Sequence, residues 1–292
     1  MAAVTPPLQP RRWPQRPGCG KNAKQGAGPM NRQMMADEHP QITVFESARV
    51  RARCFCPDRP RLIVTLDYLN RSRQGFAQRQ PSSRFLAAGF AQLIVESACN
   101  DWFLSPDLAA LRQALQSFTA MYDDVAAIGF SLGGYGALLL SRALHLRRAL
   151  LVSPQFSIFP QRAPFETRFR DLAAGLDPAL DDLPAQGDAG LQGALVFDPR
   201  LSPADAQHAA LIRGVFPGLR GVAMPFGGHP AFGLVAEARL FGRVQALLTG
   251  PEISARALHD LHRQARLHAP GYANKLLEYA ARKSAAVTPA AP

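Results

Sequence analysis

The sequence predicts an α/β fold, a mainly parallel and twisted β-sheet covered by helices on both faces. Short apolar runs rich in β-branched residues alternate with longer amphipathic segments along most of the chain. Such alternation is typical of β-α-β crossovers, which place consecutive strands parallel in one sheet. The 292 residues are 47% hydrophobic, so the chain can bury the large core that this fold needs.

The expected strands differ in how they are covered. The first two are separated by a short turn and predict an antiparallel pair at one edge of the sheet. The run at 61–66 is apolar almost throughout, as expected of a strand that has helices on both faces. The expected strands cover residues 42–45, 50–56, 61–66, 92–95, 125–128, 149–152, 194–197 and 221–224.

Helices are expected between these strands. The triplet Ser105-Pro106-Asp107 is typical of a helix start, because it combines a capping serine, a proline and an acidic residue. Leu108, Leu111 and Leu115 then recur on one helical face. The expected helices cover residues 82–90, 105–118, 133–146, 165–176, 203–215 and 232–248.

The first 40 residues differ in composition from the rest. Residues 1–40 contain seven prolines and little apolar content, so we expect a disordered basic tail. Met30, Met34 and Met35 precede the first expected strand, and each is a candidate for the true start of translation.

The remainder divides into a body and an extension. Residues 41–250 are expected to form the α/β domain. Residues 251–285 are expected to add two amphipathic helices, at 253–268 and 272–283, split by Pro270-Gly271. These helices either pack on the body or bind a partner.

The net charge of +11 raises the question of nucleic-acid binding. Residues 1–36 carry six basic and no acidic residues, whereas residues 37–250 carry 21 basic and 19 acidic residues. The body is therefore nearly neutral, and its arginines are scattered rather than interleaved with stacking aromatic residues. We expect no nucleic-acid partner.

Composition also bears on the compartment. No apolar run approaches 18 residues, so no membrane span is expected, and the basic N-terminus lacks the apolar stretch of a secretory signal. Cys19, Cys54, Cys56 and Cys99 have no zinc-site spacing and are expected to be reduced thiols. These observations predict a cytoplasmic protein without a metal or cofactor.

The most informative stretch is Gly129-Phe130-Ser131-Leu132-Gly133, between an expected strand and an expected helix. This Gly-x-Ser-x-Gly pattern is typical of a nucleophile elbow, a sharp turn that presents a serine hydroxyl. Side chains two residues before and after the serine would collide in that strained turn, which explains the glycines. The amides at the start of the helix point back at the serine and can stabilise negative charge. Ser131 is therefore the candidate nucleophile.

A serine hydroxyl needs an adjacent base, and the base needs an acid that orients it. Among seven histidines, only His229 follows an expected strand in a Gly-rich loop, from which it can reach the carboxyl edge of the sheet. Asp198 closes the preceding strand at the same edge and is the favoured acid. Asp205, early in the following helix, is the alternative.

The elbow serine, the strand-end acid and the loop histidine together resemble the α/β-hydrolase superfamily, over roughly residues 42–250. The resemblance implies an α/β-hydrolase-like three-layer fold and a catalytic triad. In that triad Ser131 is the nucleophile, His229 is the general base and then acid, and Asp198 orients the histidine.

The same resemblance implies an oxyanion hole and a cap. One oxyanion donor is the amide of Leu132, and the second is an amide in the loop after the strand at 61–66. That loop lacks the His-Gly or Gly-Gly pair of many lipases and esterases, and Tyr68 is the candidate there. The insertion at 155–193 is expected to form the cap over the substrate.

Two further motifs have alternative interpretations. The stretch Asn100-Asp101-Trp102-Phe103 forms either a pocket wall or a loop held by a core tryptophan. His259 and His262 have helical spacing for a metal, but such pairs are usually solvated polar residues.

The resemblance thus implies a serine esterase or thioesterase that acts on a small-molecule acyl substrate through an acyl-enzyme. The alternatives are an acyltransferase on the same fold and a non-catalytic binding protein. The sequence leaves the oligomeric state open.

Overall fold

The computed structural model describes residues 39–287. The expectations for the N-terminal tail and its three methionines therefore concern residues that lie outside the described range, apart from the last two residues of that tail.

Eight strands form one sheet. The first strand pairs antiparallel with the second and the second antiparallel with the fourth, whereas all other neighbours are parallel. The order across the sheet is β1-β2-β4-β3-β5-β6-β7-β8. This arrangement confirms the mainly parallel sheet with an antiparallel edge. The strands are β1 (Gln41–Glu46), β2 (Val50–Phe55), β3 (Arg61–Leu66), β4 (Phe90–Ser97), β5 (Asp124–Phe130), β6 (Arg148–Val152), β7 (Gln192–Phe197) and β8 (Leu219–Ala223).

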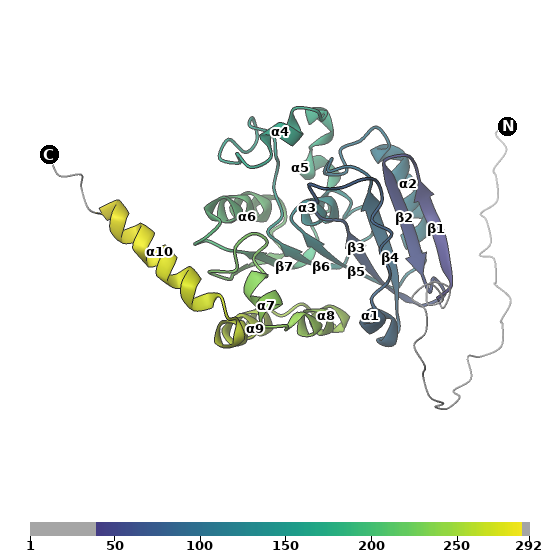
Figure 1. Cartoon of the computed structure of the whole chain (residues 1–292). Coiled ribbons are helices and arrows are strands. Elements are labelled where there is room, and N and C mark those ends of the chain that lie inside the picture. The colour runs from purple at the N-terminus through teal and green to yellow at the C-terminus, as the bar shows by residue number, and fades with distance from the viewer. Residues whose placement is uncertain (1–38, 288–292) are drawn as a thin grey trace, which may run out of the picture. The chain divides into compact units, whose positions relative to one another are not determined.

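Helices cover both faces of this sheet (Figure 1). Within the described residues, the α-helices are α1 (Ser83–Ala87), α2 (Leu108–Thr119), α3 (Leu132–Leu139), α4 (Arg170–Ala173), α5 (Leu183–Gln186), α6 (Pro203–Val215), α7 (Gly233–Glu237), α8 (Phe241–Thr249), α9 (Ala255–His268) and α10 (Tyr272–Val287). A short 3₁₀ helix, η2 (Pro178–Leu180), lies between α4 and α5.

The two faces carry separate hydrophobic cores. Leu62 and Val64 of β3 belong to the core beneath α2, α3 and α6, whereas Ile63 belongs to the core beneath α7, α8 and α9. Successive side chains of a strand point to opposite faces, so a strand between two cores must be apolar at nearly every position. The largely apolar character of the run at 61–66 has this cause.

Some helices differ from the sequence expectation. The α2 helix begins at Leu108 rather than Ser105, because residues 105–107 form a turn in which the Leu108 amide binds the Ser105 carbonyl. The helix expected over 232–248 is split into α7 and α8. Arg239 adopts a left-handed conformation at φ 58°. The Leu240 amide donates a hydrogen bond to the Val235 carbonyl, which ends α7.

The C-terminal helices contact the body in different ways. Leu258, Leu261 and Ala265 of α9 are buried in the second core. The α10 helix makes mainly polar and ring contacts, among them an ion pair of Lys275 with Glu237 at 2.6 Å. No helix within residues 39–287 combines the length and the apolar character required to cross a bilayer.

Candidate active site

The elbow sequence forms a sharp turn between β5 and α3. At this turn Ser131 has φ 49° and ψ −117°. A positive φ is strained for a residue with a side chain. A Cβ on Gly129 would lie 2.4 Å from the carbonyl oxygen of Gly133, and a Cβ on Gly133 would lie 2.5 Å from that of Asp67. Both glycines are therefore required by close backbone approaches.

Ser131, His229 and Asp205 are joined by consecutive hydrogen bonds, and we call them the serine–histidine–aspartate chain. The Ser131 Oγ lies 2.9 Å from His229 Nε2, and His229 Nδ1 lies 2.8 Å from Asp205 Oδ2. An ionised carboxylate only accepts hydrogen bonds, so Nδ1 carries the proton and Nε2 is free to take one from the hydroxyl. Ser131 is 3% exposed and Asp205 is 1% exposed, so both ends of the serine–histidine–aspartate chain are shielded from solvent.

Asp205 stands in the first turn of α6 and faces charged groups. Its Oδ1 forms an ion pair with Arg168 Nη2, 2.9 Å away. Burial by itself would raise the pKa of Asp205, but the hydrogen bond from His229 and the charges of His229 and Arg168 bring that pKa below its ordinary value. The carboxylate is therefore ionised at neutral pH.

Asp198 does not contact His229, which differs from the expectation that it orients this histidine. Its carboxylate accepts hydrogen bonds from three backbone amides, those of Arg200 at 2.7 Å, Leu201 at 3.1 Å and Gly228 at 2.7 Å. These bonds hold the Gly-rich loop one residue before the histidine. The alternative acid, Asp205, binds the imidazole because the first turn of α6 brings it there.

Arg168 connects Asp205 to a second buried pair. Its Nη2 lies 2.6 Å from Glu166, and His208 Nε2 lies 2.9 Å from the same carboxylate. The Phe156 amide donates to His208 Nδ1 at 3.0 Å, so His208 is neutral, with its proton on Nε2. Burial raises the pKa of Glu166, but the hydrogen bonds from His208 and Arg168 outweigh it and lower that pKa to about 2.

A glutamine also contacts the serine. The side-chain nitrogen of Gln155, two residues beyond the Ser153 that follows β6, lies 3.2 Å from Ser131 Oγ. Its oxygen accepts a hydrogen bond from the indole nitrogen of Trp102 at 3.0 Å. Gln155 and Trp102 are both fully buried. Trp102 is thus a core residue that is connected to Ser131 through Gln155.

The segment 155–193 follows β6 and ends in the first two residues of β7, and it contributes residues around Ser131, His229 and Asp205. Phe169 packs its ring 6.3 Å from the ring of His229 and 5.0 Å from that of Trp102. Gln155, Arg168 and Phe169 each contact a different member of the serine–histidine–aspartate chain. The expectation that this segment caps a substrate remains a prediction.

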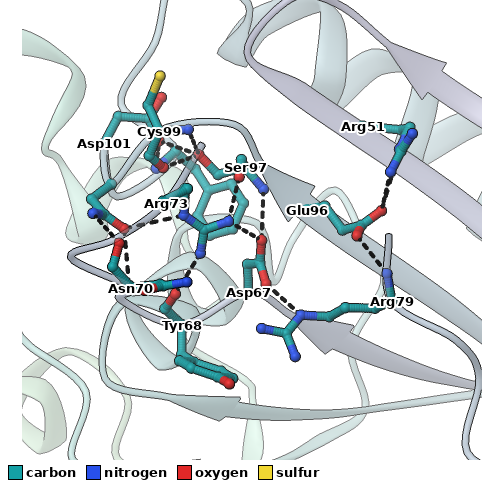
Figure 2. A network of polar contacts seen from close by, with 12 residues as sticks. Arg51, Asp67, Tyr68, Asn70, Arg73, Arg79, Glu96, Ser97, Cys99 and Asp101 are labelled. Carbon is teal, nitrogen blue, oxygen red and sulfur yellow. Dashed lines mark hydrogen bonds and ion pairs between the residues drawn. The ribbon is translucent and has the colours of Figure 1, made fainter. Parts of the chain in front are cut away.

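Ion pairs and hydrogen bonds hold the loop after β3 in place (Figure 2). The buried carboxylate of Asp67 lies 2.6 Å from Arg73 Nη1 and 2.5 Å from Arg79 Nε, and it accepts a hydrogen bond from the Ser97 amide at 3.2 Å. Arg73 also donates to the Tyr68 carbonyl at 2.7 Å. Because the Asp67 carbonyl passes directly over Gly133, these bonds position the loop beside the start of α3.

A second carboxylate holds the far end of that loop (Figure 2). Glu96 of β4 is fully buried and lies 2.9 Å from Arg51 Nη2 and 3.0 Å from Arg53 Nη2. It also accepts a hydrogen bond from the Arg79 amide at 2.9 Å. Burial raises the pKa of Glu96, but these hydrogen bonds and charges outweigh it and lower that pKa below its ordinary value.

The two expected oxyanion donors have different surroundings. Leu132 is fully buried in the first turn of α3, where an amide has no helical carbonyl to bind. Tyr68 is 47% exposed, and its ring lies 4.4 Å from the guanidinium of Arg79. Both oxyanion functions remain predictions.

A cavity of about 420 Å³ lies between the loop after β3, α1 and α8. Its wall includes Phe130, the residue that precedes Ser131. Half of the other lining residues are apolar or aromatic, among them Leu66, Tyr68, Phe85 and Phe241, and the other half are polar.

The histidine pair of α9 does not resemble a metal site. His262 is largely buried, and its Nε2 lies 3.0 Å from the Pro225 carbonyl oxygen. Within residues 39–287, no group of three or more His, Cys, Asp or Glu side chains is arranged to hold a metal ion.

Comparisons with known proteins bear on the fold. No protein-family model matches the chain, and no curated protein matches it in sequence. Solved structures do match. The capsule O-acetyltransferase of Neisseria meningitidis serogroup A is 15% identical, with 69% of this chain and 93% of that chain covered and a TM-score of 0.49. The esterase Pf2001 of Pyrococcus furiosus is 13% identical, with 78% and 100% covered and a TM-score of 0.46.

A third similar structure is the glycosylation-associated Gap123 complex of Streptococcus agalactiae. It is 16% identical and has a TM-score of 0.50, with 72% of this chain and 47% of that chain covered. At such identities the likeness describes the fold alone. The strand order and the helices on both faces show an α/β-hydrolase-like three-layer fold.

Proposed function

We propose that this protein is a serine hydrolase of the esterase or thioesterase type. The observation that carries the proposal is the serine–histidine–aspartate chain, with its two hydrogen bonds of 2.9 and 2.8 Å at the carboxyl edge of a parallel sheet. The strained elbow and the ionised, buried Asp205 support the same reading.

The mechanism follows from the hydrogen bonds. The hydroxyl of Ser131 attacks the acyl carbon while its proton passes to His229 Nε2, and the carbonyl π electrons move onto the oxygen. The resulting imidazolium is stabilised by Asp205. When the carbonyl re-forms, the bond to the leaving alcohol or thiol breaks and His229 protonates that group. Water then repeats the sequence on the acyl-enzyme and releases the acid.

We further propose that the acyl part of the substrate occupies the cavity of about 420 Å³. Phe130 lines this cavity, and it directly precedes the proposed nucleophile Ser131 in the sequence. A volume of this size suits a small molecule.

Labelling with a fluorophosphonate and turnover of p-nitrophenyl acetate test the proposal together. Wild-type protein should label and turn over, whereas Ser131→Ala should not label and should lose about 10⁶-fold in kcat. His229→Ala should lose a comparable amount, because the two groups act as one unit. Ser105→Ala is the matched control, since Ser105 is also buried and its hydroxyl has no hydrogen-bond partner among the described residues.

The outcomes separate the alternatives. Labelling or turnover that survives Ser131→Ala would exclude the mechanism. Turnover that rises with an added acceptor alcohol, with transfer of the acyl group to it, would identify an acyltransferase. A wild-type protein that neither labels nor turns over ester would instead favour a non-catalytic binding protein.

A further inference from the structure

We propose that the side-chain amide of Gln155 is an oxyanion donor for the reaction at Ser131. The inference rests on the proposed function and deepens it, because it assigns a catalytic contact that the elbow pattern does not contain. It also supplies a donor where the loop after β3 lacks the glycine pair that often serves there.

The position of the amide is the first observation. Gln155 Nε2 lies 3.2 Å from Ser131 Oγ and 3.3 Å from the carbonyl oxygen of Ser153. An amide nitrogen has two hydrogens, so one can be held by Ser153 while the other points at the reacting serine. The side chain has no exposed surface, so water does not compete for either hydrogen.

The orientation of the amide is the second observation. An indole nitrogen only donates hydrogen bonds, so Trp102 Nε1 must face the oxygen of the Gln155 amide, 3.0 Å away. That contact turns the nitrogen, and not the oxygen, toward Ser131. A glutamine that was free to flip would present an acceptor half of the time, and an acceptor there would repel a developing oxyanion.

The loop that carries Trp102 is built to hold this position. Trp102 and Phe103 both have left-handed conformations, with φ 50° and 60°, although both are bulky and fully buried. The Asp101 carboxylate accepts a hydrogen bond from the Phe103 amide at 3.1 Å, which stabilises the turn. Two consecutive strained residues in a buried loop are typical of a site in which surrounding structure enforces an exact geometry.

The chemistry gives this amide its part in the reaction. In the resting state Ser131 Oγ donates to His229 and accepts from Gln155. During attack, the Oγ proton goes to the imidazole and an Oγ lone pair forms the new C–O bond. The π electrons of the substrate carbonyl move to its oxygen, which now carries the charge beside Oγ. The Gln155 N–H then transfers its hydrogen bond to that oxygen, and a donor at rest can be long and tighten in the transition state.

Replacement of the substrate carbonyl oxygen by sulfur tests this contact directly. Sulfur accepts hydrogen bonds weakly, so an enzyme that uses oxyanion donors prefers the oxygen ester over the matching thionoester. We would measure kcat/KM for both esters with wild-type protein, Gln155→Met and Gln186→Met. Gln186 belongs to the same segment and its amide is also bonded at both ends, to Arg112 and to the Leu180 carbonyl, which makes it the matched control.

Gln155→Met should lower kcat for the oxygen ester about 10²–10³-fold, with little change in KM. It should also lower the oxygen-to-sulfur ratio of kcat/KM by about tenfold or more, because the thionoester gained little from the missing donor. Gln186→Met should leave both quantities near those of the wild type. A residue that only held the serine rotamer would slow both esters equally and leave the ratio unchanged.

Trp102→Phe is the second variant, because it keeps an aromatic ring while it frees the Gln155 amide. It should lower the ratio in the same direction by a smaller factor, and thermal unfolding of each variant reports whether it folds. An unchanged ratio in a folded Gln155→Met or Trp102→Phe would overturn this inference alone. A wild-type protein without turnover, or turnover that survives Ser131→Ala, would overturn the proposed function and this inference with it.

Discussion

Asp198 and Asp205 lie seven positions apart, at the same edge of the sheet, and both are buried. They differ in what surrounds them. Asp198 binds only uncharged backbone amides, whereas Asp205 binds an imidazole and lies beside a guanidinium. The comparison teaches that burial and sequence position do not decide which carboxylate contacts the imidazole. In the proposed reaction only Asp205 would interact with the group that gains the proton, since its partner is His229.

The largest expected effect separates the two carboxylates by substitution. Asp205→Asn should lower kcat for p-nitrophenyl acetate about 10⁴-fold, because an amide can donate to Nδ1 and favour the wrong imidazole tautomer. Asp198→Asn should lower kcat by less than about tenfold, while it lowers stability by about 1–3 kcal/mol, because its new NH₂ group faces backbone N–H donors.

Steady-state kinetics and urea unfolding of both variants measure this difference. Equal losses of kcat from the two substitutions would break the comparison, since they would mean that the loop contact of Asp198 matters as much as the imidazole contact of Asp205.

A smaller effect is expected when only the surroundings of Asp205 change. Arg168→Met removes a cation that competes with His229 for the carboxylate, so the imidazolium should become more stable. The acid limb of the pH profile of kcat/KM should then move to higher pH. Arg170→Met, two residues away and exposed, is the control and should leave the profile in place. A purely structural role of Arg168 would reduce activity at all pH values without moving the limb.

The smallest expected effect is on the pH dependence of stability and concerns Glu166, which forms an ion pair with Arg168. Because the pKa of Glu166 is lowered to about 2 in the folded protein, its ionisation contributes stability that is present above pH 4.5 and is lost as pH falls toward 2. Glu166→Gln should therefore be less stable than wild type at pH 7, and the difference should shrink between pH 4.5 and 2. Urea unfolding at several pH values measures it. A difference that stays constant with pH would mean that Glu166 does not hold Arg168 through its charge.

The sequence predicts the sheet well because the strands are defined locally. The eight short apolar runs carry their own signal, and all eight strands are present within the described residues. The elbow is equally local, since two glycines and a serine at fixed spacing already specify the turn around Ser131. His229 is identifiable because it is the only histidine in a Gly-rich loop after an expected strand.

The carboxylate that contacts His229 could not be chosen from the sequence, because the choice depends on the path of the polypeptide after β7. Asp198 and Asp205 both have a plausible position, and only the direction of the first turn of α6 decides which side chain reaches the imidazole. Gln155 carried a weak signal, since it follows a strand end at the same edge as Ser131. Arg168 carried no such signal, because it lies in a turn just before α4 and not in a strand or helix.

The segment 155–193 contacts every member of the serine–histidine–aspartate chain, and this has a consequence for the design of variants. A lid that only encloses substrate can be exchanged between related scaffolds to alter selectivity while turnover is retained. Here a graft of that insertion would also exchange the amide beside the nucleophile and the cation beside the acid. Under the proposed function, a change in selectivity made through this segment would therefore also change the rate.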